Sequence, residues 1–257
     1  MNFESSVITL TFGDAAENHV GMEMIGSRGS TGSGFTVAEL EALAAADPRA
    51  ELFRLPAPPG VEPATVEQAA VLVIRGAIDA ETHAAMFEEQ ASLEHDKKAF
   101  MYGRIVNKKL RWNLCFDTEA HPPDYAAGRG RVIALSSVPL LERVVTSWPA
   151  TFGPKAADLK GEGNYYYNPL KCGIGWHGDT ERRKVIALRL GAPMMPIHYR
   201  WYNKGDPVGP VINVPLSGGD IYIMSEKAVG SDWKCRSKLT LRHSTGAVAA
   251  SLARGPK

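Results

Sequence analysis

Residues 184–224, KVIALRLGAPMMPIHYRWYNKGDPVGPVINVPLSGGDIYIM, decide the fold class. Short runs rich in β-branched and aromatic residues alternate here with glycine, proline and aspartate, a pattern typical of strands joined by turns. The predicted strands, including two that flank this stretch, are Asn164–Tyr167, Lys184–Leu190, Ile197–Trp201, Val208–Val214, Ile221–Met224 and Leu239–Leu241. Their spacing indicates a sandwich or barrel, and a double-sheet jelly roll fits best.

The residues that precede this β-rich region contain clear helix signals. Thr36-Val-Ala-Glu39 is a capping-box pattern and predicts a helix over about Val37–Ala45. Asp79 is placed to cap a helix that runs to about Leu93, and Ser137-Val-Pro139 opens a third helix. We therefore expect an α+β protein with a mainly β C-terminal core and flanking N-terminal helices.

Two further strands and a linker are predicted in the N-terminal half. Val7–Phe12 alternates like a short strand, and Ala70–Ile74 has the composition of a buried one. The proline-rich segment Leu55–Pro63 between them is the best candidate for a linker. The predicted organisation is an N-terminal extension of unknown role over residues 1–60 and a main domain over residues 64–257, with its jelly-roll core at about 130–250.

Composition limits where the protein works and what it binds. The 29 basic and 28 acidic residues nearly cancel, so nucleic-acid binding requires a local basic patch. Cys115, Cys172 and Cys235 are odd in number and form no CxxC pair, which argues against disulfides and a thiolate zinc site. No apolar stretch approaches the roughly 20 residues needed to span a bilayer. We expect a soluble intracellular protein of the cytoplasm or nucleus.

The sharpest chemical feature is His177-Gly-Asp179. Residues two apart in a strand point to the same face, so this pair presents an imidazole and a carboxylate side by side. A facial site for non-haem iron needs two imidazoles and one carboxylate, and leaves the remaining positions open. The motif predicts two of these three ligands, whereas an exposed surface turn is the alternative interpretation.

A second feature is the arginine pair Arg236 and Arg242. Six residues apart, they lie on the same face of a strand, where two guanidinium groups could hold the ends of a short dicarboxylate. An edge strand that carries basic residues for solubility is the alternative.

Taken together and in order, these motifs resemble the AlkB-like Fe(II)/2-oxoglutarate-dependent dioxygenase family over about Asn164–Gly246. The segments that carry the resemblance are Asn164-Tyr-Tyr-Tyr167, Ile174-Gly-Trp-His-Gly-Asp179, Val185–Pro193, Gly219–Met224 and Arg236–Arg242. The resemblance implies a double-stranded β-helix fold and an oxygenase activity that uses Fe(II), 2-oxoglutarate and O2. It also implies metal binding by His177 and Asp179, and co-substrate binding by Asn164, Tyr167, Arg236 and Arg242, with Tyr165 as an alternative to Tyr167.

The third metal ligand departs from the family pattern. Residues 225–233, SEKAVGSDW, contain no histidine, and we predict that Asp232 replaces it. Two histidines are alternatives. His198 is expected to pack or to face the substrate, and His243 is expected to face away from the pocket because Arg242 beside it faces inward.

The resemblance also suggests a substrate. Residues 107–112, NKKLRW, combine basic and aromatic side chains, and we predict that Lys108, Arg111, Trp112 and Arg129 contact single-stranded or flipped-out nucleic acid. The expected reaction is hydroxylation or oxidative demethylation of a base. Two alternatives stay open: a protein or small-molecule hydroxylase, and a non-catalytic binding protein that has lost the third histidine.

Overall fold

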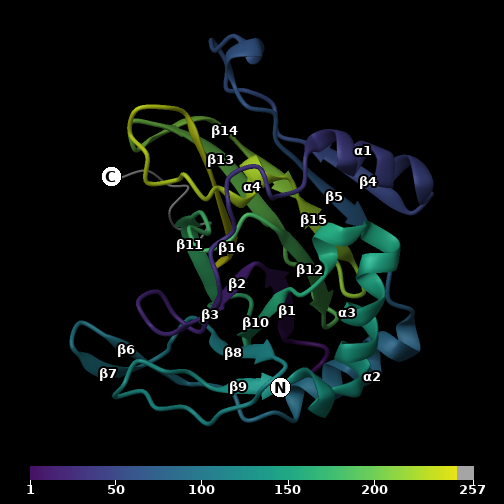
Figure 1. Cartoon of the computed structure of the whole chain (residues 1–257), viewed down its shortest axis with the longest axis vertical. Coiled ribbons are helices and arrows are strands. Elements are labelled where there is room, and N and C mark those ends of the chain that lie inside the picture. The colour runs from purple at the N-terminus through teal and green to yellow at the C-terminus, as the bar shows by residue number, and fades with distance from the viewer. Residues whose placement is uncertain (248–257) are drawn as a thin grey trace.

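The structure is a computed structural model and describes residues 1–247. Its two largest β-sheets pack face to face, with a layer of helices on the outer face of the larger one (Figure 1). One apolar core lies between the helices and the larger sheet, and a second lies between the two sheets. The expectation of a mainly β protein with flanking helices is confirmed.

The larger sheet has eight strands and is antiparallel except for the β8–β9 pair, which is parallel. Its order is β4 (Ala50–Arg54), β5 (Ala70–Ile74), β15 (Ile221–Met224), β12 (Val185–Leu190), β1 (Val7–Gly13), β10 (Lys160–Tyr166), β8 (Trp112–Asp117) and β9 (Val132–Ala134). The smaller sheet has the order β11 (Gly173–His177), β16 (Thr240–Gly246), β13 (Ile197–Asn203) and β14 (Asp206–Val214).

The N-terminal strand β1 lies in the middle of the larger sheet. It pairs with β10 on one side and with β12 on the other. Its apolar residues Ile8, Leu10 and Phe12 pack in the helix-side core, while Thr9 and Thr11 face the smaller sheet and line a cavity. The first residues of the chain are therefore part of the main fold, in contrast to the separate extension predicted over residues 1–60.

The proline-rich segment Leu55–Pro63 joins β4 to β5, and these two strands pair with each other. Trp201 of the smaller sheet also donates a hydrogen bond from its indole nitrogen to the carbonyl oxygen of Pro56, at 2.7 Å. The segment is therefore a long connection within one sheet. The predicted domain boundary near residue 60 does not separate two packed units.

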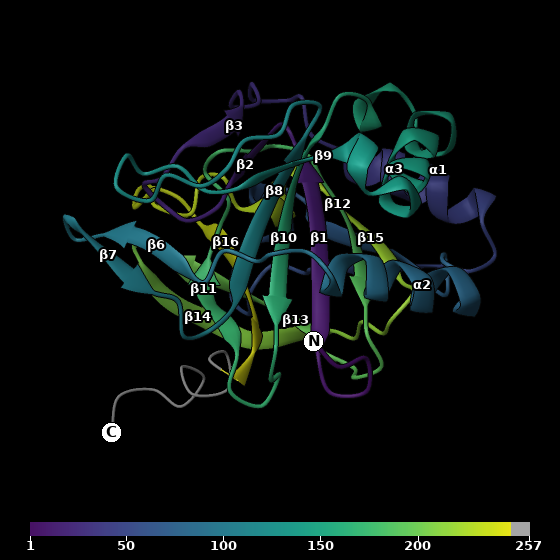
Figure 2. The ribbon, with the colours of Figure 1, turned by 90° about the horizontal axis from the view of Figure 1, so that it is seen from below.

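The helices begin where their capping residues predict. Helix α1 (Val37–Ala46) has the complete capping box of Thr36 and Glu39, and α2 (Ala80–Ala91) is capped by Asp79. Helix α3 (Pro139–Phe152) starts with proline and packs Trp148 edge-on against Phe12, with ring centroids 5.3 Å apart. In Figure 2, α2 and α3 lie on one side of β1, and β11 and β14 lie on the other.

The remaining elements are small. Two hairpins are formed by β2 (Ala15–Glu17) with β3 (Met24–Gly26) and by β6 (Lys98–Met101) with β7 (Arg104–Asn107). A short helix, α4 (Glu226–Val229), precedes β16. Three 3-10 turns cover Pro63–Thr65, Leu135–Ser137 and Pro154–Ala156. Among residues 1–247, no helix is long and apolar enough to cross a membrane.

Candidate metal site

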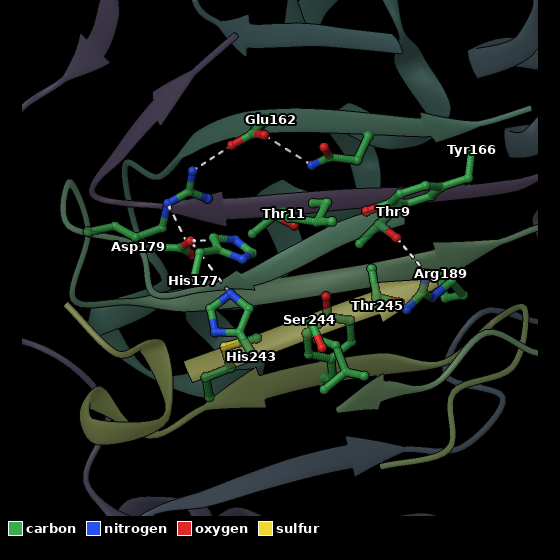
Figure 3. Close-up of a pocket in the computed structure, with 16 residues that line it drawn as sticks. Thr9, Thr11, Glu162, Tyr166, His177, Asp179, Arg189, His243, Ser244 and Thr245 are labelled. Atoms are coloured by element: carbon green, nitrogen blue, oxygen red, sulfur yellow. Dashed lines mark hydrogen bonds and ion pairs between the residues drawn. The ribbon is translucent and has the colours of Figure 1, made fainter. Parts of the chain in front are cut away.

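Three side chains meet at one end of a cavity between the two sheets: His177 at the end of β11, Asp179 just after it, and His243 of β16 (Figure 3). Their possible ligand atoms all lie within 4.8 Å of one another. The Nε2 atoms of His177 and His243 lie 3.5 Å and 3.6 Å from the same carboxylate oxygen of Asp179. Two imidazoles and a carboxylate therefore converge on one point.

The pairing of β11 with β16 brings the two histidines together. His177 and His243 are direct cross-strand partners, and their ring centroids are 4.4 Å apart. Such partners share a face of a sheet, and their Cβ atoms are separated by about 5 Å. The expectation that His243 faces away from the site is wrong, because on this strand it is the histidine that points into the cavity.

Arg242 occupies the opposite face of β16, as alternation requires. Its guanidinium carbon lies 3.9 Å from the ring centroid of Tyr202 and 5.1 Å from that of Trp233. Arg236 is exposed in the loop before the strand. Neither arginine lines the cavity, so the structure does not bring the predicted co-substrate arginines to the metal end.

Asp232 is also absent from the histidine cluster. Its carboxylate binds the ammonium groups of Lys227 at 2.8 Å and Lys238 at 3.0 Å. These two ammonium groups neutralise the Asp232 carboxylate outside the cavity. The third side chain of the cluster is His243 instead. The predicted ligand Asp232 is therefore corrected to His243. His198, the other alternative, contacts Asn213 at 2.6 Å and is not in the cluster.

The electrostatics of the cluster suit a cation. Burial, followed by the neighbouring His243, lowers the pKa of His177 to about 4, so this imidazole is neutral at pH 7. Its Nδ1 lies 2.8 Å from the carbonyl oxygen of Gly175, and donation there leaves Nε2 as the free ligand atom. Burial works against ionisation of Asp179, but the charge of Arg182 and contact with His243 hold its pKa well below its usual range.

Arg182 forms an ion pair with Asp179. Its side chain is almost completely buried and lies 3.8 Å from the Asp179 carboxylate. It also forms ion pairs with Glu162 at 2.6 Å and Glu181 at 2.9 Å. Charged neighbours of this kind orient a ligating carboxylate and tune its affinity for a metal.

Gly178, between the two ligands of the motif, has no room for a side chain. A Cβ atom there would lie 2.0 Å from the carbonyl oxygen of Gly230. The backbone of the turn after β11 is therefore pressed against the chain that follows α4. The same contact region includes the hydrogen bond from the Asp179 amide to the carbonyl oxygen of Val229, at 3.1 Å.

The strand β10 forms one wall of the cavity through Glu162, Asn164 and Tyr166. Asn164, one of the predicted co-substrate residues, therefore lines the cavity. Tyr165 points to the helix-side core, where its hydroxyl donates to Gln90, and Tyr167 donates to the carbonyl oxygen of Lys109. Of these three consecutive tyrosines, Tyr166 reaches the cavity, between the two that the sequence suggested.

The predicted nucleic-acid contacts are largely engaged within the protein. Lys108 donates to Asn18 at 2.6 Å and to Asn113 at 2.9 Å, and Arg111 donates to Asn164 at 2.6 Å. Trp112 stacks on Tyr167 with ring centroids 4.6 Å apart. Arg129 pairs with Asp124 at 3.5 Å.

The cavity residues that sequence reasoning did not select include Thr9, Arg189 and His243. Thr9 lies far from the motif in the sequence and gave no signal. Arg189 could have been found, because an arginine within the apolar run VIALRL is unusual in a buried strand.

Comparison with known proteins yields one informative relative. The chain is 44% identical over 245 residues to "Uncharacterized protein R156" of Acanthamoeba polyphaga mimivirus. The match covers 93% of this chain and 95% of the viral protein. The chain belongs to the same family as this protein. No model of a known protein family matches the chain, and the name of the viral relative assigns no activity.

The cluster predicts a specific pattern of metal binding. His177→Ala and His243→Ala should each weaken Mn2+ binding by at least about tenfold, because each removes a ligand and the loss of an outer-sphere partner alone costs 10–100-fold. Asp232→Ala should bind Mn2+ like the wild type. Titration calorimetry measures these affinities. If Asp232→Ala loses Mn2+ binding while His243→Ala keeps it, Asp232 rather than His243 is the third ligand.

Lys108 predicts a pH dependence of stability. Burial lowers its pKa from 10.5 to about 7, whereas the unfolded chain keeps the proton to about pH 10.5. The penalty for burying the charge therefore applies fully below pH 7 and shrinks as the pH rises toward 10. Relative to Lys108→Met, the free energy of unfolding of the wild type should rise between pH 7 and pH 9.5, by at most about 1.4 kcal/mol per pH unit. Urea unfolding at several pH values measures the difference in unfolding free energy between the wild type and Lys108→Met. A difference that does not change with pH would contradict the prediction.

Proposed function

We propose that this protein is an Fe(II)- and 2-oxoglutarate-dependent dioxygenase that hydroxylates or oxidatively demethylates a nucleic-acid base. The observation that carries the proposal is the convergence of His177, Asp179 and His243 at the wall of a cavity. Two histidines and one carboxylate on one face are characteristic of non-haem Fe(II) oxygenases, in which the remaining coordination positions accept co-substrate and dioxygen.

The chemistry of the donors fits this metal. His177 is neutral at physiological pH and Asp179 is ionised, which are the forms that bind a divalent cation. Bound Fe(II) would supply the dioxygen activation that amino-acid side chains do not provide. The protein's part is to hold the three ligands, to keep Asp179 oriented through Arg182, and to place the reacting groups in a cavity between the sheets.

We also propose that the two sheets form a jelly roll in which β1 replaces the last strand. From β10 to β16 the chain alternates between the sheets, except that β13 and β14 are consecutive in the smaller one; β10, β12 and β15 lie in the larger sheet and β11, β13, β14 and β16 in the smaller. The slot between β10 and β12 is filled by β1 from the N-terminus. This arrangement supports a double-stranded β-helix with a rearranged strand order.

The proposed substrate class is supported by the hairpin of β6 and β7 with its flanks, residues 97–111, which we call the basic hairpin. Its sequence KKAFMYGRIVNKKLR has six basic residues and no acidic one. The tip residue Tyr102 is 89% exposed, and Ile105 and Leu110 are also exposed. Arg111 at its base binds Asn164 of the cavity wall, so the hairpin adjoins the candidate site. Basic and aromatic groups together suit a single-stranded nucleic acid.

The two alternatives now differ in support. The hypothesis of a non-catalytic binding protein was based on the lack of a third histidine, and the presence of His243 in the cluster removes that basis. A protein or small-molecule hydroxylase uses the same metal site and predicts no affinity for oligonucleotides. Substrate binding, rather than the metal site, therefore distinguishes this hydroxylase from the proposed nucleic-acid dioxygenase.

Succinate release from 2-oxoglutarate under air with Fe(II) tests the proposed activity. The wild type and Asp232→Ala should turn over, whereas His177→Ala and His243→Ala should lose at least about 99% of the rate, since both histidines hold the metal. Methylated oligonucleotides should stimulate the wild type. Absence of turnover in iron-loaded wild type would refute the oxygenase, and turnover without oligonucleotide dependence would favour the small-molecule or protein hydroxylase.

The basic hairpin predicts salt-dependent binding of single-stranded DNA. Lys98→Ser with Arg104→Ser should weaken binding and reduce the slope of log K against log salt by about 1.4, because each lost phosphate contact on a single strand contributes about 0.7. The matched control is Arg143→Ser with Lys204→Asn, two exposed basic residues elsewhere. Fluorescence anisotropy measures both. Equal effects in the two double variants would mean that the hairpin is not the binding surface.

A further inference from the structure

Arg189 is a buried cation in the middle of strand β12. Val185, Ala187 and Arg189 point toward the smaller sheet, and the alternate residues Ile186, Leu188 and Leu190 pack in the helix-side core. The side chain of Arg189 is 1% exposed. A buried charge is costly unless it is paired, so its partners are informative.

The pairing of Arg189 within the protein is incomplete. Its Nη1 donates to the hydroxyl of Thr9 at 2.7 Å, whereas its Nε has no hydrogen-bond partner. Among residues 1–247 no carboxylate lies within ion-pair distance of it; Asp220, a nearby acid, is bound by Arg75 at 2.8 Å. Arg182, buried to a similar degree in the same cavity, has three carboxylates around it. Arg189 is therefore a guanidinium that lacks a counter-ion.

The surroundings of Arg189 suit an anion. Near Arg189 the cavity is lined by the hydroxyl-bearing residues Thr9, Tyr166 and Thr245 (Figure 3). The two acids of the cavity, Glu162 and Asp179, are bound to Arg182 at the other end. One cation and several hydroxyl groups with no acid among them match the hydrogen-bonding needs of a carboxylate.

The two ends of the cavity are a short distance apart. Figure 3 shows the histidine cluster at one end and Arg189 at the other. Along β1, Thr9 lies opposite Arg189, and Thr11 lies opposite Glu162, which binds Arg182 beside the cluster. Two residues of strand span about 7 Å, which suits a dicarboxylate of about five carbons.

We propose that Arg189, together with Thr9 of the N-terminal strand, binds the distal carboxylate of a short 2-oxo dicarboxylate whose other end chelates the metal at His177, Asp179 and His243. This inference rests on the proposed function for the metal end only. It assigns the carboxylate to β12, and neither Arg242 of β16 nor Arg236 in the loop before it takes part. It also makes the N-terminal strand part of the ligand site, and it predicts rejection of 2-oxo acids that lack the second carboxylate.

The test compares ligands and variants by calorimetry on Mn2+-loaded protein, with 2-oxoglutarate as the dicarboxylate and 2-oxobutyrate as the monocarboxylate. The wild type should prefer 2-oxoglutarate. Arg189→Gln should lose roughly 10- to 100-fold in affinity for 2-oxoglutarate and should lose the preference, because one charge-assisted contact accounts for it. Thr9→Val should show a smaller loss. Arg242→Gln, outside the cavity, should bind like the wild type.

Two controls distinguish a loss of carboxylate binding from a loss of folding or of metal binding. Arg189→Met should melt at the same temperature as the ligand-free wild type or higher, since it removes an unpaired buried charge. Mn2+ affinity should be unchanged in Arg189→Gln, as this residue is not a metal ligand.

Each outcome decides one of the two proposals. Equal binding of 2-oxoglutarate by Arg189→Gln and wild type, or equal binding of both acids by the wild type, would overturn the role of Arg189 and leave the metal site intact. Failure of the wild type to bind any divalent metal would refute the proposed function. In that case, thermal stabilisation of metal-free wild type by 2-oxoglutarate, lost in Arg189→Gln, would still support the carboxylate site.

Discussion

The candidate site depends on one pairing, that of β11 with β16. This pairing places His177 opposite His243 and lets both imidazoles reach the same oxygen of Asp179. A shift of one residue in the register would turn His243 to the outer face and bring Arg242 to the cavity. The convergence of the two histidines on Asp179 therefore follows from this register.

A polar cavity inside a sandwich requires that its charges be compensated. At the metal end, Arg182 is neutralised by Glu162, Glu181 and Asp179. At the other end, the side-chain partner of Arg189 within residues 1–247 is the hydroxyl of Thr9, and its Nε has none there. The two ends of the cavity therefore differ in the charge that they suit. One end suits a cation held by three ligands, and the other suits an anion from outside the protein.

The N-terminal strand is the element that the resemblance described least well. The motifs after residue 164 lie in the expected order along the chain, yet the strand with the sequence TLRH pairs with β11 and β13, and β1 fills the slot between β10 and β12. Arg242 on that strand and Arg236 in the loop before it therefore lie outside the cavity. An arginine from β12 and a threonine from β1 line the cavity in their place.

The sequence by itself determined much of the local structure: the capped helices, eight of the sixteen strands among residues 1–247, and the His177–Asp179 pair. Capping and alternation act between residues close in the chain. The sequence did not determine His243, Arg189 and Thr9 as neighbours, or Asp232 as a partner of Lys227 and Lys238. These depend on which strands pair and which face each turns inward. Only the tertiary structure decided that, because sheet order and register are set by contacts between residues distant in sequence.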